Sequence, residues 1–433
     1  MNIVKDVSAD RNTAKKFFIC MICGCPRREL DTQRIYSYFI ANGMVFSKNY
    51  KETDWLVLVT CAFIREVEDW SIYQIKYFLK HKPKNSRIVL TGCLPKINPG
   101  RLKELGEFEV LSPRELDKFD GIVKGKVRFA DIRDSYEKPG FSLLADDYIS
   151  FYTLRNILFH FELSKTFFLK CFFWLRKTVK ILGALKVKLP DHICPDYYLD
   201  PREMLIIRVA RGCIGACSYC VIRFANGRIE SKLKDEIINE FKAGLKRGYK
   251  KFVLIAEDTG AYGIDSHSSI IELLNEVFII EGDYKLILDD IHPQWLIKYC
   301  DDLVRIFSKH HSKIDFIISP VQAGSDRVLR LMRRPYKIDS LKDCLKRLQA
   351  EVSNLKIKTH IIVGFPGETE EDFEKTKELC REFRFFNVRI FGYTDRPNTE
   401  ASKMSGKIPQ KIINKRIKRL IEDIEAFAKE PRR

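Results

Sequence analysis

Apolar runs alternate with helical patterns near the start of the chain, between residues 15 and 125. The runs KFFICMI, WLVLVT and RIVLTG are almost wholly apolar, and segments 28–42 and 65–81 between them have helical spacing. Such continuous apolar runs are typical of strands that are buried on both faces of a sheet. The pattern therefore predicts an α/β domain with a doubly wound parallel sheet.

The alternation returns between residues 203 and 400, where six apolar runs are separated by helical patterns. The runs are MLIIRVA, KFVLIA, YKLILDD, DFIISPV, KTHIIVGF and VRIFGY. Six βα units in a row predict a partial (β/α)6 barrel, in which active-site residues lie on the loops that follow the strands. A helical segment at residues 401–433 comes after this domain.

The two α/β blocks are separated by an insertion at residues 140–195. Within it, residues 151–190 contain nine aromatic side chains, and eight Lys and Arg residues against the single acidic residue Glu162. Lys170, Arg176 and Lys177 interrupt any window long enough to span a membrane. We expect amphipathic helices that pack on the enzyme; the alternative is a basic, aromatic contact with a membrane surface or a carrier.

Composition narrows the class of protein. The 433 residues are 45% hydrophobic and 31% charged, as in ordinary globular proteins. The N-terminal MNIVKDVSAD has no apolar core of a secretory signal, so we expect a cytoplasmic protein. Thirteen cysteines in a reducing compartment indicate metal ligation or catalysis. The net charge of +18 fits a nucleic-acid partner or simply a solvated basic surface.

The loop RGCIGACSYC follows the first strand of the predicted barrel and holds Cys213, Cys217 and Cys220. Structural zinc usually draws on paired C-x-x-C units and four ligands, so a zinc site would need a fourth ligand from elsewhere. A 4Fe-4S cluster held by three thiolates instead keeps one iron open for a substrate or cofactor. The spacing therefore favours an iron-sulfur cluster over zinc.

A second set of cysteines lies in the N-terminal block, where Cys25, Cys61 and Cys93 each follow a predicted strand. The carboxyl ends of parallel strands meet at one edge of a sheet, so these thiols are expected to converge there. Three thiolates again predict a cluster site. Cys20 and Cys23 are so close to Cys25 that spacing alone leaves the first ligand open.

The C-x-x-x-C-x-x-C motif, with Tyr219 before its last Cys, resembles the signature of the radical S-adenosylmethionine (SAM) superfamily. The single cysteines after successive N-terminal strands resemble the methylthiotransferases that modify tRNA adenosines or a ribosomal protein. Further matches are PVQAGSDRVLRLMRR, THIIVGFPGETEEDFEKT and YTDRPNTEASKM. The resemblance covers residues 15–125 and 203–427. In the family a Gly-Cys pair is followed by an Asp, and GCPRRELD matches this pattern, which favours Cys25 over Cys23 as the first ligand.

This resemblance implies a radical SAM methylthiotransferase with two 4Fe-4S clusters. SAM on the open iron of the cluster at Cys213, Cys217 and Cys220 would be cleaved to a radical that removes hydrogen from an unactivated C-H bond. The cluster at Cys25, Cys61 and Cys93 would carry a sulfur that a second SAM methylates. An electron donor of the flavodoxin or ferredoxin type and a sulfur donor are implied as partners of a monomer.

Contacts to SAM are expected at the carboxyl ends of the barrel strands. The candidates are Tyr219, Glu257, Gln322, Ser325 and Gly364. Ser325 has the alternative role of a helix cap. Gly364 can let the backbone approach SAM, or can serve a tight turn between strand and helix. No catalytic residue is assigned beyond the cluster ligands.

Two departures from the family bear on the substrate. The sequence stops after the end helix, where members continue into an RNA-binding TRAM domain, and the insertion at 140–195 is extra. We therefore expect a peptide, protein or small metabolite rather than tRNA, although basic residues of the end helix could bind RNA: Lys411, Lys415, Arg416, Lys418 and Arg419. The alternatives are a tRNA adenosine methylthiotransferase, sulfur insertion without methyl transfer, and a non-catalytic metal-binding nucleic-acid adaptor.

Overall fold

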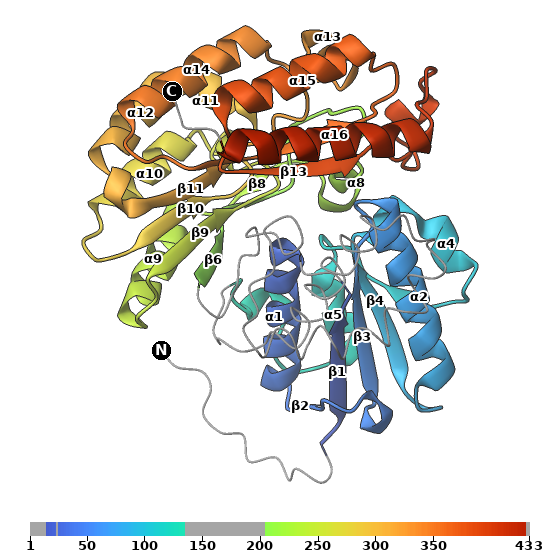
Figure 1. The fold of residues 1–433 in the computed structure, drawn as a ribbon. Coiled ribbons are helices and arrows are strands. Elements are labelled where there is room, and N and C mark those ends of the chain that lie inside the picture. Colours follow the sequence, from blue (N-terminus) through green and yellow to red (C-terminus); the bar gives the residue numbers. More distant parts are fainter. Residues whose placement is uncertain (1–13, 23–24, 135–203, 430–433) are drawn as a thin grey trace. The chain divides into compact units, whose positions relative to one another are not determined.

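The computed structural model describes residues 14–22, 25–134 and 204–429 (Figure 1). The chain forms two compact units, one built on the N-terminal sheet and the other on residues Leu205–Arg433 with two short N-terminal segments. The predicted insertion at 140–195 lies outside the described residues. Among the helices of the described part, none combines the length and the apolar composition that crossing a membrane requires.

The N-terminal unit contains a five-stranded sheet in its described residues, in the order β2-β1-β3-β4-β5. All of its pairs are parallel. The predicted strands are β1 (Lys16–Met21), β3 (Trp55–Thr60) and β4 (Arg87–Gly92), and the edge strands β2 (Val45–Phe46) and β5 (Glu109–Val110) have two residues each. The helices are α1 (Pro26–Ala41), α2 (Arg65–His81), α3 (Leu94–Ile97), α4 (Pro99–Lys103) and α5 (Phe119–Val123).

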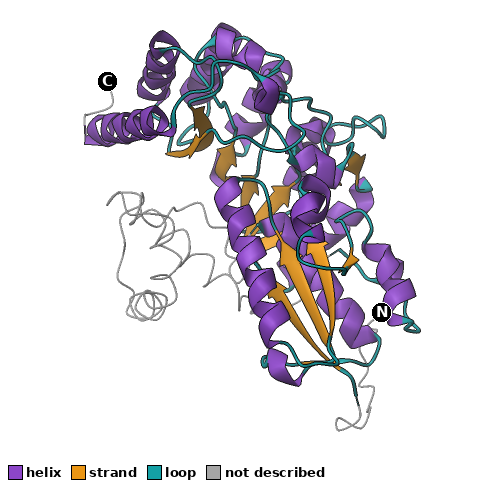
Figure 2. Cartoon of the chain, turned by 90° about the vertical axis from the view of Figure 1, so that its right-hand side faces the viewer, coloured by secondary structure: helices purple, strands orange, loops and turns teal. Residues whose placement is uncertain are grey.

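Both faces of this sheet are covered, which confirms the doubly wound prediction. Phe17 of β1 packs against Phe39 of α1, with ring centroids 4.9 Å apart. The next residue, Phe18, points to the opposite face and packs against Phe78 of α2, at 5.8 Å. Helices flank the strands, drawn in orange, in Figure 2. Strand β3 runs through the middle of the sheet, and every one of its residues is buried.

The second unit contains a six-stranded sheet in its described residues, and its strands follow one another in chain order. The strands are β6 (Met204–Arg208), β9 (Lys251–Ile255), β10 (Lys285–Leu288), β11 (Ile314–Ile318), β12 (Ile357–Val363) and β13 (Asn387–Gly392). The pairs from β9 to β13 are parallel. All six predicted strands are therefore present, and the partial barrel is confirmed.

Amphipathic helices connect these strands and bury their apolar faces against the sheet. The longer ones are α9 (Lys234–Lys246), α10 (Ile270–Ile279), α12 (Cys300–Lys309), α14 (Ile338–Glu351) and α15 (Glu370–Phe383). The short helices are α8 (Ile222–Asn226), α11 (Pro293–Lys298) and α13 (Asp326–Leu331), and an antiparallel ribbon joins β7 (Ala210–Arg211) to β8 (Glu230–Ser231). The helices cover the sheet, so the carboxyl ends of the strands and the loops that follow them are the place where a functional site is expected.

The predicted end helix is α16 (Gln410–Lys429). It lies along α15 and β13 and also contacts β12 (Figure 1). Its apolar side is buried through Ile413 and Leu420. Helix α16 is thus packed onto the last part of the barrel.

Candidate functional site

The cysteine loop of the barrel lies between β7 and α8. Gly212 precedes Cys213 and has a φ of +76°, and a Cβ atom at this position would lie 2.1 Å from the carbonyl oxygen of Arg228. Only glycine fits this conformation and this close approach. The backbone N–H of Gly212 donates to Oε2 of Glu257 at 2.7 Å. The predicted SAM contact Glu257 therefore also anchors the start of the loop.

The thiols of Cys213, Cys217 and Cys220 lie near one another on this loop, and none forms a disulfide. Burial raises the pKa of Cys220 to about 11, with a further contribution from the charge of Cys217. Burial, followed by the charge of Asp258, raises the pKa of Cys213, although its sulfur accepts a hydrogen bond from the N–H of Gly215 at 3.1 Å. Thiols that are partly buried and close together are suitable ligands for a metal cluster, which would keep them deprotonated.

A buried guanidinium stands beside these thiols. Arg334 has 6% of its surface exposed and follows α13. Its Nη1 lies 3.9 Å from Sγ of Cys217 and 3.3 Å from Oη of Tyr219. Its Nη2 donates to the carbonyl oxygen of Pro320, just after β11. The donor set of three thiols with a fixed cation nearby fits an anionic iron-sulfur cluster.

The structure does not bring any three His, Cys, Asp or Glu side chains of its described residues together as ligands of a single ion. In a 4Fe-4S cluster each thiolate binds a different iron, so the ligands of such a cluster need not meet at one point. The three thiols of the barrel loop remain our candidate ligands.

Two further polar residues lie beside the cysteine loop. Asp258 follows β9 and accepts hydrogen bonds from Nε1 of Trp295 at 2.8 Å and from the N–H of His292 at 3.2 Å. Burial raises the pKa of Asp258 to about 6. Burial, followed by the charge of Arg334, lowers the pKa of His292 to about 2, so this imidazole is neutral. Polar groups held away from water in this way are frequent at functional sites.

Sequence reasoning singled out Glu257 but not Asp258, His292 or Arg334. Asp258 directly follows Glu257 at the same strand end, so its position could have identified it as a candidate site residue. Arg334 is the second of two adjacent arginines in LMRRPY, and nothing in that pattern distinguishes the buried arginine from the exposed Arg333. Its contact with Tyr219 joins residues 115 positions apart, which no local pattern reports.

Gln322 has a conformation and an environment that suit a ligand contact. Its φ is +74°, and its backbone N–H donates to the carbonyl oxygen of His360 at 2.8 Å. The side chain is buried, and its Oε1 has no hydrogen-bond partner among the described residues. A buried amide oxygen without a partner is costly, so a polar group of a bound cofactor would satisfy it. The predicted contact between Gln322 and SAM remains a prediction.

Ser325 and Tyr219 have definite partners. Ser325 is the N-cap residue of α13, as the alternative predicted, but its hydroxyl donates to Oδ1 of Asp372 at 2.5 Å and makes no capping hydrogen bond to the helix. Tyr219 packs against Phe365, with ring centroids 6.2 Å apart, and its hydroxyl lies at Arg334. Whether Ser325 and Tyr219 also contact SAM stays a prediction.

Gly364 lies on the loop between β12 and α15 with a φ of +80°. A Cβ atom there would lie 2.4 Å from Cγ1 of Ile413. The space that a side chain would need is thus filled by α16. The backbone N–H of Gly364 donates to Oε2 of Glu368 at 2.8 Å. These contacts fix the loop and account for the glycine without reference to a cofactor.

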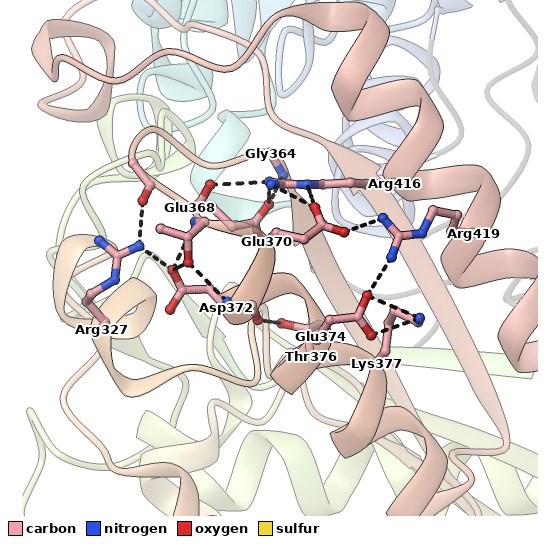
Figure 3. Close-up of polar contacts among 12 residues, drawn as sticks. Arg327, Gly364, Glu368, Glu370, Asp372, Glu374, Thr376, Lys377, Arg416 and Arg419 are labelled. Atoms are coloured by element: carbon pink, nitrogen blue, oxygen red, sulfur yellow. Dashed lines mark hydrogen bonds and ion pairs between the residues drawn. The ribbon is translucent and has the colours of Figure 1, made fainter.

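Ion pairs hold α16 to this loop and to α15 (Figure 3). Arg416 and Glu368 are both buried, and Nη1 lies 2.7 Å from Oε2. Burial raises the pKa of Glu368 to about 7. The hydrogen bond from the Gly364 N–H and the charge of Arg416 lower this pKa, but burial has the larger effect. Arg419 pairs with Glu370 and with Glu374. Arg416 is therefore not available to RNA phosphates as the sequence suggested, and Arg419 is already paired within the protein.

Asp372 joins the start of α15 to the start of α13. With Thr369 it forms a capping box at the start of α15, and it also accepts hydrogen bonds from Ser325 and Arg327. Burial alone would favour the protonated carboxyl, but the hydrogen bonds from Arg327 and Ser325 outweigh it and hold the pKa of Asp372 well below its usual range. The ionised carboxylate therefore stabilises the fold.

Replacement of Asp372 by Asn is expected to lower the free energy of unfolding at neutral pH by about 2 kcal/mol. Because the folded pKa is lowered, the stabilisation is present above about pH 4 and is lost as the pH falls further, since the unfolded state then binds the proton first. Urea unfolding of both proteins over this pH range measures the difference. The exposed neighbour Glu371→Gln should cost only about 0.5 kcal/mol, and a D372N deficit that persists in acid would contradict the prediction.

The N-terminal unit places its three candidate cysteines at one edge of the sheet. Cys25 is the N-cap of α1, Cys61 follows β3 and Cys93 follows β4. Strands β1, β3 and β4 are neighbours and run parallel, so their carboxyl ends lie together. Burial raises the pKa of Cys25, and the charge of Cys61 adds to this effect. Cys25 and Cys61 are thus close enough to interact.

Local contacts hold Cys61 and Cys93 in place. The hydroxyl of Ser71 accepts from the N–H of Cys61 at 3.1 Å and donates to its carbonyl oxygen at 2.7 Å. Gly92, before Cys93, has a φ of +95°, and a Cβ atom there would lie 2.1 Å from the carbonyl oxygen of Thr60. Both Cys93 and Cys213 are therefore preceded by a glycine that no other residue can replace without strain. Cys23 lies outside the described residues, so the preference for Cys25 stays a prediction.

Comparison with known proteins gives two family matches. Residues 207–380 match the Radical SAM superfamily, and residues 16–111 match the Uncharacterized protein family UPF0004. Among solved structures, the radical SAM methyltransferase TsrM from Kitasatospora setae has a TM-score of 0.54 at 9% identity, covering 90% of this chain and 77% of that one. At this identity the likeness concerns the fold alone.

Curated relatives cover most of the chain. A probable threonylcarbamoyladenosine tRNA methylthiotransferase of Methanocaldococcus jannaschii is 29% identical over 394 residues, which are 91% of this chain and 79% of that protein. The ribosomal protein uS12 methylthiotransferase RimO of Carboxydothermus hydrogenoformans is 28% identical over 415 residues, 94% of this chain and 82% of that protein. Both are similar to this chain in both of its units.

These matches agree with the fold of the two units. They identify the chain as an enzyme whose cofactors are SAM and 4Fe-4S clusters, and they do not favour the non-catalytic adaptor. The chain belongs to the radical SAM methylthiotransferase family.

Proposed function

We propose that this enzyme inserts a methylthio group at an unactivated C-H bond of a protein or peptide. Cys213, Cys217 and Cys220 hold the cluster that binds SAM. The observation that carries the proposal is the group of three neighbouring thiols on one barrel loop, with the buried cation of Arg334 beside it. When bound, the clusters and SAM supply the C-H activation and the sulfur.

The other barrel residues bind and orient the cofactor. Glu257 fixes the start of the cysteine loop through Gly212, and Gln322 offers an unsatisfied amide oxygen to a polar group of SAM. Tyr219 and Phe365 form an aromatic contact next to the thiols that helps to exclude water from the reaction. Each of these roles follows from a position at the carboxyl end of a barrel strand or on the cysteine loop.

In this proposal each domain holds a different cluster. Residues 15–125 hold the sulfur-carrying cluster through Cys25, Cys61 and Cys93, and residues 203–400 hold the SAM-cleaving cluster. Helix α16 braces the barrel. An electron donor of the flavodoxin or ferredoxin type and a sulfur donor complete the system, and the enzyme works as a monomer.

The choice of a polypeptide substrate rests on the charges of α16. The relatives named for tRNA and for ribosomal protein uS12 have similar identities to this chain, so they do not separate the two substrates. Of the basic residues of α16, Arg416 is buried in an ion pair and Arg419 is paired with Glu370 and Glu374. This reduces the positive surface that would attract RNA. A small metabolite remains a variant of the proposal.

The competing function is methylthiolation of a tRNA adenosine, which the net charge of +18 favours and for which the relative from Methanocaldococcus jannaschii is named. A comparison of a host with and without the gene decides between them. Mass spectrometry of ribosomal proteins, other peptides, metabolites and tRNA nucleosides should show that one polypeptide loses the mass of a methylthio group while the tRNA profile is unchanged. Disappearance of a methylthioadenosine from tRNA would overturn the polypeptide proposal. A product carrying sulfur without its methyl group would identify sulfur insertion instead.

A further inference from the structure

Arg334 is buried beside the cysteine loop without a carboxylate partner. Its Nη1 donates to Sγ of Cys217 and lies at Oη of Tyr219, and its Nη2 donates to the carbonyl oxygen of Pro320. Its Nε has no hydrogen-bond partner among the described residues, and its guanidinium forms no ion pair with any of them. Asp258 acts on Arg334 only through space, because its oxygens bond to Trp295 and His292.

A buried cation without a counter-ion destabilises a fold unless an anion is supplied. No carboxylate of the described residues contacts Arg334 directly, whereas three thiols lie on the adjacent loop. A 4Fe-4S core bound by three thiolates is a net anion, and one-electron reduction makes it more negative. Arg334 therefore interacts more favourably with the reduced cluster than with the oxidised one.

Hydrogen bonds to ligand sulfurs and nearby charges are recognised means by which a protein sets a cluster potential. Arg334 provides both in one side chain, since Nη1 contacts Cys217 and the guanidinium is shielded from solvent. We propose that Arg334 raises the reduction potential of the SAM-binding cluster and so makes its one-electron reduction by a protein donor favourable. This inference rests on the proposed assignment of Cys213, Cys217 and Cys220 as ligands.

Arg334 also has a structural part, which the test must separate. Its bond to Pro320 ties the loop after α13 to the end of β11, and its guanidinium lies 5.5 Å from the centre of the Tyr336 ring. Two variants are therefore needed: Arg334→Gln removes the charge, and Arg334→Lys keeps the charge but loses the planar fork. Arg333→Gln is the matched control, because Arg333 is the adjacent residue, is largely exposed and pairs with Glu400.

The experiment is an anaerobic redox titration of the full-length holoenzyme, followed by electron paramagnetic resonance. The cluster whose spectrum changes on addition of SAM is the one to follow. We expect Arg334→Gln to lower the equilibrium constant for one-electron reduction about tenfold, a shift of about 59 mV for a one-electron couple. Arg334→Lys should lower it by about threefold, Arg333→Gln should leave it unchanged, and SAM affinity should stay within about twofold of the parent enzyme.

An unchanged potential in Arg334→Gln with normal iron content overturns the inference. So does weaker SAM binding without a change in potential, which would make Arg334 a direct SAM ligand. If Arg334→Gln binds no cluster, the Arg334→Lys titration decides by the same criterion. A SAM-responsive cluster that survives in Cys217→Ala would instead refute the ligand assignment on which the inference rests, so the two failures are distinguishable.

Discussion

Replacement of Cys213, Cys217 and Cys220 together by Ala is expected to abolish reductive SAM cleavage. On the proposed assignment these thiolates hold the cluster that delivers the electron, so the variant loses that cluster. Iron and sulfide should fall by about half, because the N-terminal cluster would remain. The measurement is deoxyadenosine formation from SAM with a strong chemical reductant, alongside iron content.

The control is Cys380→Ala, which changes a buried cysteine of α15 that lies outside both candidate sites. Burial raises the pKa of Cys380 to about 12, as expected for a thiol that acts only in packing. This variant should cleave SAM at the normal rate. Persistent cleavage by the triple variant would show that the SAM-binding cluster has other ligands.

Replacement of Cys61 or Cys93 by Ala is expected to stop product formation without stopping SAM cleavage, which is the second largest effect that we expect. SAM cleavage should continue, since its cluster lies in the barrel, but the methylthiolated product should disappear. The two cysteines lie at the ends of neighbouring strands, and on the proposed assignment the loss of either removes a ligand from the same cluster. Parallel assays of deoxyadenosine and of substrate mass separate the two activities.

Cys20→Ala is the matched control for this pair, because Cys20 lies inside β1, where it is buried, and not at the strand end. It should retain product formation, apart from a modest loss of stability. Cys23→Ala and Cys25→Ala can be ranked by the same assays, with loss of product expected only for Cys25. Product made by a Cys61 variant would refute the role of this cluster as sulfur carrier.

The repeating elements of the fold could be predicted because their signal is local. The WLVLVT and RIVLTG runs became β3 and β4 at the predicted residues, and the helix predicted at 65–81 is α2. Runs of apolar residues that are too short for a helix leave few alternatives. The strands β2 and β5 were missed since they have two residues each, and such edge strands carry no periodic pattern.

The cysteines of the candidate site could be proposed from sequence because their spacing is typical of cluster ligands, and their role as ligands stays a prediction. Arg334 and Asp258 were not found, since their importance comes from contacts made by the fold. The side-chain partner of Ser325 was missed for the same reason: its position before a short helix suggested a capping hydroxyl, but the hydroxyl donates to Asp372, 47 positions away. Charges that meet across the barrel have no signature in a single sequence.

The ion pairs between α16 and the β12–α15 loop also have a consequence for protein engineering. A barrel fragment that stops before Gln410 would leave the buried carboxylate of Glu368 without its guanidinium and would uncover the backbone at Gly364. Loss of one partner from a buried pair is more damaging than the absence of both. Expression boundaries for the catalytic unit should therefore include α16, and a C-terminal tag belongs beyond this helix.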